Sequence, residues 1–133
     1  VLQSKLLSLQ RCIHRIREKT PASVEQLARD YDLQDIIILN LQRAIQISID
    51  IATHLLAETG NTPGTMAEAF LLLHREGFLS KELAHGMARS IGLRNIAVHE
   101  YTSLDWKIVH AVATGHLGEF SAFGEEVAAV TKK

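Results

Sequence analysis

The sequence has 133 residues, of which 47% are hydrophobic and 22% charged, and its formal net charge is −1. This length suits one domain spanning residues 1–133, and the composition excludes a disordered or collagen-like chain. The near-neutral charge provides no overall attraction to nucleic acid, whose protein partners usually present a basic face. We therefore expect a single globular domain.

The cysteine content and the hydropathy pattern bear on the compartment. Cys12 is the only cysteine and lies in an apolar pattern, so we expect a buried structural thiol in a reducing environment. Residues 1–10 show no secretory signal, and no stretch approaches the roughly 18 uncharged apolar residues of a membrane span. These features predict a soluble, cytoplasmic protein without a membrane partner.

The first half of the chain predicts three helices. An amphipathic helix is expected from residue 2 to about 18, and Pro21 stops it. Ser23 and Gln26 form a capping box for a short helix that ends near Arg29. Asp32 is then the expected N-cap of a long helix over residues 33–58. The first helix is predicted by apolar residues at steps of three and four: Leu2, Leu6, Leu9, Ile13 and Ile16.

The long segment 33–58 is apolar over more than half of its helical circumference. Residues 36–39 alone would also suit a strand, but the three-to-four period persists for over twenty residues without a turn signal. Such a helix is either central to the fold or also forms a subunit contact.

Charge is distributed unevenly along the first half of the chain. Residues 1–19 contain five basic residues and Glu18 as their one acid, whereas residues 24–59 contain six acids. These two segments should therefore face each other or water.

The second half predicts three or four more helices. Thr65 and Glu68 form another capping box, and Ser80 caps the helix after it. Ser103 or Asp105 begins a further helix, which Gly115 breaks before a last helix to the C-terminal lysines. The inward-facing residues are expected to be Met66, Phe70 and Leu73, then Leu83, Met87 and Ile91, then Trp106, Val109 and Val112. Together these elements predict an all-α antiparallel helical bundle.

The apolar stripe of the Ser80-capped helix, Leu83, Met87 and Ile91, continues into a polar segment. We call Arg94, Asn95, His99 and Tyr101 of this segment the polar cluster. Gly92 lowers helix propensity there and marks either a bend or a close backbone approach. On an ideal helix Arg94 and Tyr101 share a face, while His99 lies about 140° from Arg94. Either the helix loosens near His99, or the residues converge across a symmetry axis with those of a second subunit.

The chemistry of this cluster suits a phosphodiester. Arginine offers a planar fork of donors to phosphate, and histidine is the side chain that titrates near neutral pH without assistance. Tyr101 can stack on a base or donate to phosphate, and Asn95 can orient either group. In RNA the 2′-hydroxyl is a built-in nucleophile, so an imidazole base and an arginine suffice without a metal.

Other polar residues are assigned structural roles. Asp50 and Glu100 are possible acid partners of the cluster, but solvated or ion-paired carboxylates are the simpler interpretation. Trp106 and Phe120 are core residues by default. No metal or other cofactor is expected, because none of the other histidines has a histidine or cysteine partner three or four residues away: His14, His54, His74, His85, His110 and His116.

The Arg94-x4-His99-x-Tyr101 pattern, with Asn95 directly after the arginine, resembles the signature of the HEPN superfamily and specifically of its HepT-like toxins. The resemblance covers nearly the whole chain, and its other parts are Leu41-Gln42-x-Ala44-Ile45, Pro63-Gly64-Thr65 before Phe70 and Leu73, and Gly92-Leu93. It implies a helical homodimer in which two motifs line one cleft and cleave RNA without a metal. Arg94 and His99 would be catalytic, with Asn95 and Tyr101 as supporting, RNA-binding residues.

The resemblance also implies a partner, because such toxins are paired with a small nucleotidyltransferase antitoxin. Tyr101 would be the acceptor at which adenylate is attached, which would fill the cleft with bulk and negative charge. Two alternatives stay open. One is a non-catalytic module whose cluster holds a nucleotide or RNA for a partner nucleotidyltransferase, and the other is a helical dimer of purely structural use.

Overall fold

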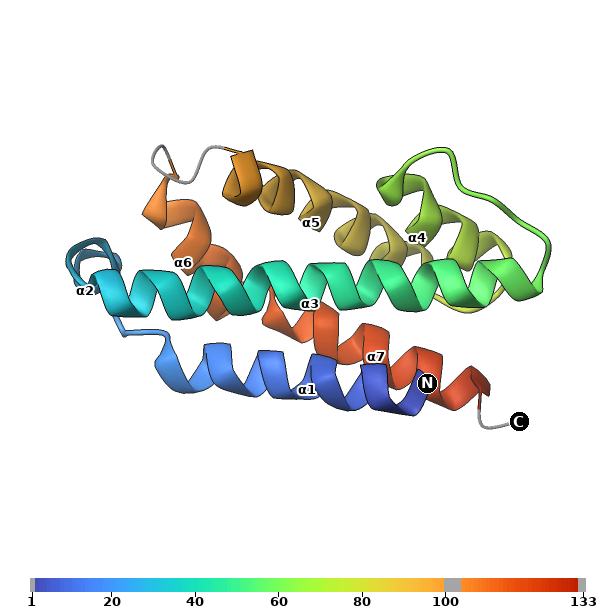
Figure 1. The fold of residues 1–133 in the computed structure, drawn as a ribbon, viewed down its shortest axis with the longest axis horizontal. Coiled ribbons are helices and arrows are strands. Elements are labelled where there is room, and N and C mark those ends of the chain that lie inside the picture. The colour runs from blue at the N-terminus through green and yellow to red at the C-terminus, as the bar shows by residue number, and fades with distance from the viewer. Residues whose placement is uncertain (1, 100–103, 132–133) are drawn as a thin grey trace.

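A computed structural model of the chain describes residues 2–99 and 104–131, and for residues 94–99 it describes the backbone but not the side chains. This part of the chain forms a helical bundle, as predicted (Figure 1). The helices are α1 (Leu2–Lys19), α2 (Val24–Arg29), α3 (Tyr31–Glu58), α4 (Met66–Arg75), α5 (Lys81–His99), α6 (Trp106–Gly115) and α7 (Leu117–Thr131).

The long helix α3 runs the length of the bundle, and α1 and α5 pack on it in the opposite chain direction (Figure 1). It also contacts α2, α4 and α7, which confirms that it is central. By length and composition α3 could cross a membrane, but 56% of its most apolar window is buried within the bundle. A core helix meets the same criterion, and the fold accounts for its apolar character.

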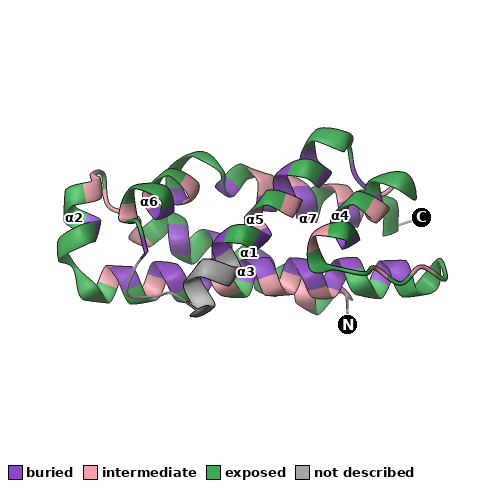
Figure 2. Cartoon of the chain, turned by 90° about the horizontal axis from the view of Figure 1, so that it is seen from above, coloured by how far each residue is buried: buried purple, intermediate pink, exposed green. Residues whose placement is uncertain are grey.

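The core brings together side chains from distant parts of the chain. Phe70 of α4 and Phe123 of α7 meet edge to face, with ring centroids 5.8 Å apart and an interplanar angle of 82°. Cys12 of α1 is 6% exposed, which confirms the expected buried thiol. Figure 2 shows buried positions on the inner sides of the helices and exposed ones outside. The described helices therefore share a single core, to which α3 contributes its buried face.

Several helix starts have the predicted caps. The Ser23 hydroxyl accepts a hydrogen bond from the Gln26 amide at 3.2 Å, and the Thr65 hydroxyl accepts one from the Glu68 amide at 3.1 Å. Of the two predicted starts for α6, Asp105 is the N-cap, and its carboxylate accepts from the Lys107 amide at 3.0 Å. These bonds satisfy amides that a helix start leaves without intrahelical partners.

Two expectations at helix starts are wrong. The N-cap of α3 is Asp30, not Asp32: its Oδ1 accepts from the Leu33 amide at 3.1 Å, and its own amide donates to the Gln26 carbonyl at 3.2 Å. One residue thus ends α2 and begins α3, which leaves Asp32 in the first turn. Met66 does not face inward: it is 42% exposed, because it is the first residue of α4 and burial begins at Ala69.

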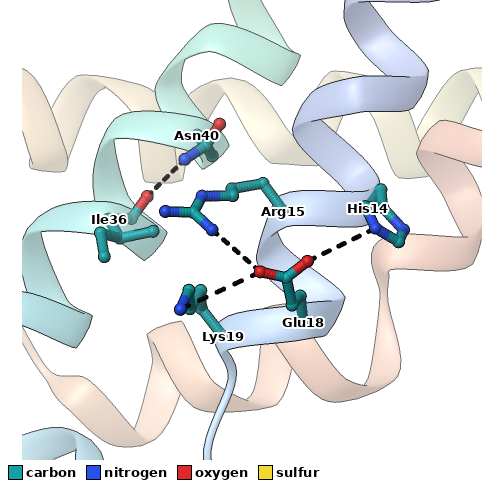
Figure 3. Close-up of polar contacts among 6 residues, drawn as sticks. All are labelled: His14, Arg15, Glu18, Lys19, Ile36 and Asn40. Carbon is teal, nitrogen blue, oxygen red and sulfur yellow. Dashed lines mark hydrogen bonds and ion pairs between the residues drawn. The ribbon is translucent and has the colours of Figure 1, made fainter.

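The basic helix α1 packs against α3, as the charge pattern suggested. Lys5 Nζ of α1 lies 3.6 Å from Asp50 Oδ2 of α3. Within α1, Arg15 donates to Glu18 at 2.9 Å, and His14 and Lys19 lie near the same carboxylate (Figure 3). The two charged segments therefore meet, and Glu18, the one acidic residue of α1, offsets a single unit of its basic charge.

The capping role of Asp30 can be tested against that of Asp32. Asp30→Ala should lower the free energy of unfolding by about 1 kcal/mol, because the Leu33 amide loses its acceptor. Asp32→Ala is the matched control and should cost about 0.3–0.5 kcal/mol, since it removes only a charge near the positive end of the helix. Urea unfolding at one fixed protein concentration measures both. An equal or larger loss in Asp32→Ala would contradict this assignment.

Cys12 provides a pH-dependent test of burial. Burial raises the pKa of its thiol, an effect that Arg43 and Arg11 partly offset. The unfolded thiol ionises first, so this group should reduce stability as the pH rises above about 8.5. Iodoacetamide should modify the native protein at pH 8 far more slowly than the urea-unfolded chain, as followed by mass spectrometry. Equal rates for the two states would show that the thiol is accessible.

Candidate functional site at the end of α5

The predicted catalytic segment lies at the C-terminal end of α5. Arg94, Asn95 and His99 belong to its last two turns, and the backbone is α-helical through His99. The described backbone is thus helical up to His99, and the expected loosening near His99 stays a prediction, because residues 100–103 lie outside the described part of the chain. Tyr101 and Glu100 lie outside the described residues. The structure thus fixes the helical spacing of three of the four motif residues.

Helix α5 is anchored at its start. The Ser80 hydroxyl accepts from the Leu83 amide at 3.3 Å, which confirms the predicted cap, and the Ser80 amide donates to Glu126 Oε1 of α7 at 3.0 Å. The helix continues through Gly92, where an added Cβ would meet no atom within 4 Å, so no close backbone approach occurs among the described residues. The C-terminal end of α5 lies toward the same end of the bundle as α6 (Figure 1).

The inner face of α5 fixes how this helix lies on the bundle. The predicted stripe of Leu83, Met87 and Ile91 is buried, and Leu93 is 9% exposed immediately before Arg94. This face packs against α3, α4 and α7. Rotation or sliding of α5 would expose these apolar side chains to water. Packing therefore sets the position of the turn from which the motif begins.

A groove of about 240 Å³ opens between α5, α6 and α7, on the flank of the same helix. Leu93 contributes from α5, Ile108 and Val112 from α6, and Phe120 from α7. Phe120 is 2% exposed, so its predicted core role is confirmed, whereas Ile108 is 53% exposed. The groove thus combines a buried apolar floor with an apolar side chain open to water.

Polar groups border this groove. His116 Nδ1 lies 3.1 Å from Glu119 Oε1, and Arg89 and Ser90 of α5 are also in the lining. A Cβ at Gly86 would overlap the Glu119 carboxylate, so the carboxylate rests against the bare Cα of this glycine. From the sequence His116 was only one of several scattered histidines. Its i, i+3 spacing from Glu119 was visible, but the groove and Gly86 became evident only in the fold.

The remaining candidates have structural partners. Asp50 pairs with Lys5 and accepts from Gln46 Nε2 at 3.0 Å, so the ion-paired interpretation is confirmed. His74 Nδ1 lies 2.9 Å from the Leu79 carbonyl. Among residues 2–93 and 104–131, no group of three histidine, cysteine or acidic side chains could hold a metal ion.

Known sequences provide relatives over most of the chain. The "mRNA nuclease HepT" of Shewanella oneidensis is 36% identical over 92% of this chain and 92% of its own length. The "tRNA nuclease HepT" of Aphanizomenon flos-aquae is 31% identical over 79% of this chain and 72% of its own length. Two relatives that match most of this chain are thus named as nucleases of different RNAs.

Solved structures resemble the fold closely. A toxin–antitoxin crystal structure with AMP-PNP contains a chain with a TM-score of 0.89 and 34% identity, covering 96% of this chain and 97% of that chain. A tri-AMPylated HEPN toxin of Shewanella oneidensis in complex with MNT antitoxin has a TM-score of 0.88 and 35% identity, with 96% of each chain covered. The Bacillus subtilis protein YutE, at a TM-score of 0.84 and 11% identity, shares the fold alone.

The family model described as ribonuclease HepT-like matches residues 9–127. This match includes the central helix α3, the whole of α5 and the groove beside it. Together with the relative that is 36% identical over 92% of the chain, it settles the family. The chain belongs to the ribonuclease HepT-like family of HEPN proteins.

Proposed function

We propose that this protein is the toxin of a toxin–antitoxin pair and acts as an endoribonuclease, with Arg94 and His99 as its catalytic residues. The observation that carries the proposal is the intact Arg94-x4-His99-x-Tyr101 motif in a member of the ribonuclease HepT-like family. The names of two relatives as RNA nucleases support the same activity. Because one is named for mRNA and the other for tRNA, we assign RNA as the substrate class without choosing between them.

The proposed mechanism uses the nucleophile that RNA itself carries. His99 removes the proton of the 2′-hydroxyl, and the 2′-oxygen attacks the adjacent phosphorus. The bond to the 5′-oxygen of the next nucleotide breaks, and that oxygen takes up a proton, leaving a 2′,3′-cyclic phosphate on the upstream product. Arg94 stabilises the extra charge on the phosphoryl oxygens, Asn95 orients the reacting groups, and Tyr101 contacts the RNA. No step requires a metal ion.

The helical backbone of α5 supports a dimeric site. Positions 94 and 99 lie about 140° apart around the axis of a regular helix, and α5 is helical through residue 99. One copy therefore presents these two positions in divergent directions. A second copy related by a two-fold axis would place its own pair opposite the first. We infer that the active enzyme is a homodimer with both motifs in one cleft.

We also propose a nucleotidyltransferase antitoxin as the partner. A related toxin of 35% identity has been solved in complex with an MNT antitoxin in a tri-AMPylated state. In this chain we assign Tyr101 as the modified residue, because a phenol in the motif is a suitable acceptor for adenylate. The attached phosphate would repel an RNA phosphate from the cleft. RNA, antitoxin and nucleotide donor would meet in the cytoplasm.

A non-catalytic nucleotide-binding or RNA-binding module is the alternative. The net charge of −1 favours it mildly, since RNA-cleaving proteins need some attraction to a polyanion. Incubation of the pure protein with RNA in a chelator separates the two, because only the enzyme shortens the RNA.

Substitution of the catalytic residues tests the enzyme directly. His99→Ala should reduce RNA cleavage by about 10²–10⁴-fold, the usual contribution of general acid–base catalysis. Arg94→Ala should reduce it by about 10²–10³-fold through lost charge stabilisation. Cleavage is measured on labelled RNA, and growth inhibition should fall in parallel.

Two exposed residues of the same types provide matched controls. His54→Ala on α3 and Arg75→Ala on α4 remove similar side chains far along the sequence from the motif, and both should cleave normally. Circular dichroism and dimer mass should be equal in all four variants. If cleavage survives in both Arg94→Ala and His99→Ala, this catalytic assignment is wrong.

Modification is tested with the two tyrosines of the chain. After co-expression with the nucleotidyltransferase, mass spectrometry should show added adenylate in the wild type and in Tyr31→Phe, but not in Tyr101→Phe. Tyr31 is a stringent control because it is 77% exposed and thus accessible to any unselective transferase. Adducts that persist in Tyr101→Phe, or disappear in Tyr31→Phe, would refute the assignment.

A further inference from the structure

The groove between α5, α6 and α7 has the dimensions and surface of a site for one flat aromatic ring. Its volume is about 240 Å³, and its apolar lining includes the buried Leu93 and Phe120 and the half-buried Val112. Apolar contacts of this type favour the faces of a ring that must leave water. The exposed side chain of Ile108 extends the apolar surface to the rim.

The rim offers hydrogen-bonding groups for the edges of such a ring. Arg89 is an exposed donor in the lining and forms no ion pair among the side chains that the structure describes. The Ser90 hydroxyl donates to the Met87 carbonyl at 2.6 Å, which leaves its oxygen lone pairs to accept. An apolar floor with a few polar groups at the edge is typical of small-ligand sites.

Among these groups, His116 is 59% exposed and has a carboxylate partner. Glu119 Oε1 lies 3.1 Å from its Nδ1, and the carboxylate itself lies against Gly86. A carboxylate on one imidazole nitrogen fixes the ring orientation and the tautomer, which leaves Nε2 for a ligand. Within the described part of the chain, no hydrogen bond or ion pair occupies Nε2 of His116.

The groove and the motif share one helix. Leu93 immediately precedes Arg94, and Ser90 lies one turn before it. From Arg89 to Arg94 the backbone advances by only about 7.5 Å along the axis, at 1.5 Å per residue. When an RNA phosphate is bound at the motif, the base of the adjoining nucleotide can reach the groove across this distance. Single-stranded RNA is read in this way, through unstacked bases placed on apolar or aromatic surfaces and bonded at their edges.

We propose that this groove binds one nucleobase next to the cleaved phosphate, and that His116, held by Glu119, contacts the edge of that base and sets the sequence preference of cleavage. The inference rests on the proposed ribonuclease activity and identifies a specificity element for it. Glu119 is a positioning residue, and Gly86 provides the space in which its carboxylate lies.

Cleavage of a randomised RNA pool, with sequencing of the fragment ends, tests the role of the groove. His116→Ala should reduce base discrimination at one position beside the cut by about tenfold, and Val112→Phe, which fills the groove, should raise KM by about tenfold with little change in kcat. The matched controls are His54→Ala, which removes another imidazole with a glutamate partner, and Ala128→Leu, which narrows the separate groove between α1 and α7. Both controls should keep the wild-type cut pattern.

The support of His116 is tested with Gly86→Ala, which must displace the Glu119 carboxylate, and with Glu119→Gln, which keeps an acceptor for the imidazole. Gly86→Ala should relax the base preference as His116→Ala does, whereas Glu119→Gln should retain most of it. Gly124→Ala is the control, because a Cβ there makes only ordinary contacts with Leu6 and Leu9. Circular dichroism and dimer mass verify that each variant is folded.

Direct binding separates this inference from the ribonuclease proposal. NMR of the wild-type protein should show the His116 ring signals shifting on titration with nucleoside monophosphates, but not with ribose 5-phosphate. If the His116 signals shift but the protein does not cleave RNA, the groove binds a base and the proposed ribonuclease activity is refuted. Cleavage with no shift, and an unchanged cut pattern in His116→Ala and Val112→Phe, would overturn the base site. If His116→Ala and Val112→Phe weaken antitoxin binding but leave the cut pattern unchanged, the groove is instead a contact surface for the antitoxin.

Discussion

Burial of α3 between helices on opposite sides is the contact on which the rest of the bundle depends. Helix α1 packs along one side and α5 along another, both antiparallel to it, while α4 and α7 meet through the Phe70–Phe123 pair. Helix α5 packs on α3 and more extensively on α4, which itself packs on α3. Glu126 and Ser80 then fix the start of α5, so that its far end emerges at a defined place. The position of the motif segment therefore depends on this packing.

The end of α5 shows how backbone geometry limits the chemistry. A regular helix separates positions 94 and 99 by about 140°, and the backbone is helical through both. Positions that are close together in the sequence motif therefore lie at different angles around the helix axis. The proposed two-fold dimer would resolve this conflict, because each subunit could contribute part of a shared cleft. The groove beside the motif adds a different surface, which suits recognition of a base more than the chemistry of the phosphate.

Local signals predicted the helices well because they act over short distances. The capping residues Ser23 and Thr65 bond to amides three residues away, so the sequence contains both partners. Asp30 was missed because two helices meet without a loop, and one residue then serves both ends. Met66 was misassigned because its exposure depends on where α4 enters the bundle. The family signature singles out the segment 94–101, and its catalytic role stays a prediction. The contact of Gly86 with Glu119 depends on the packing of α5 against α7, which no local pattern contains.

The central claim is that the 2′-hydroxyl of RNA is the nucleophile at the end of α5 and that no metal takes part. The most direct measurement maps one cut site in a short RNA, in excess chelator, and then replaces the nucleotide on the 5′ side of the cut with its 2′-deoxy form. The unmodified RNA should yield an upstream product ending in a cyclic phosphate, and the single 2′-deoxy substitution should abolish cutting at that site. Continued cutting at the substituted site, or complete inhibition of the unmodified reaction by chelator, would contradict it.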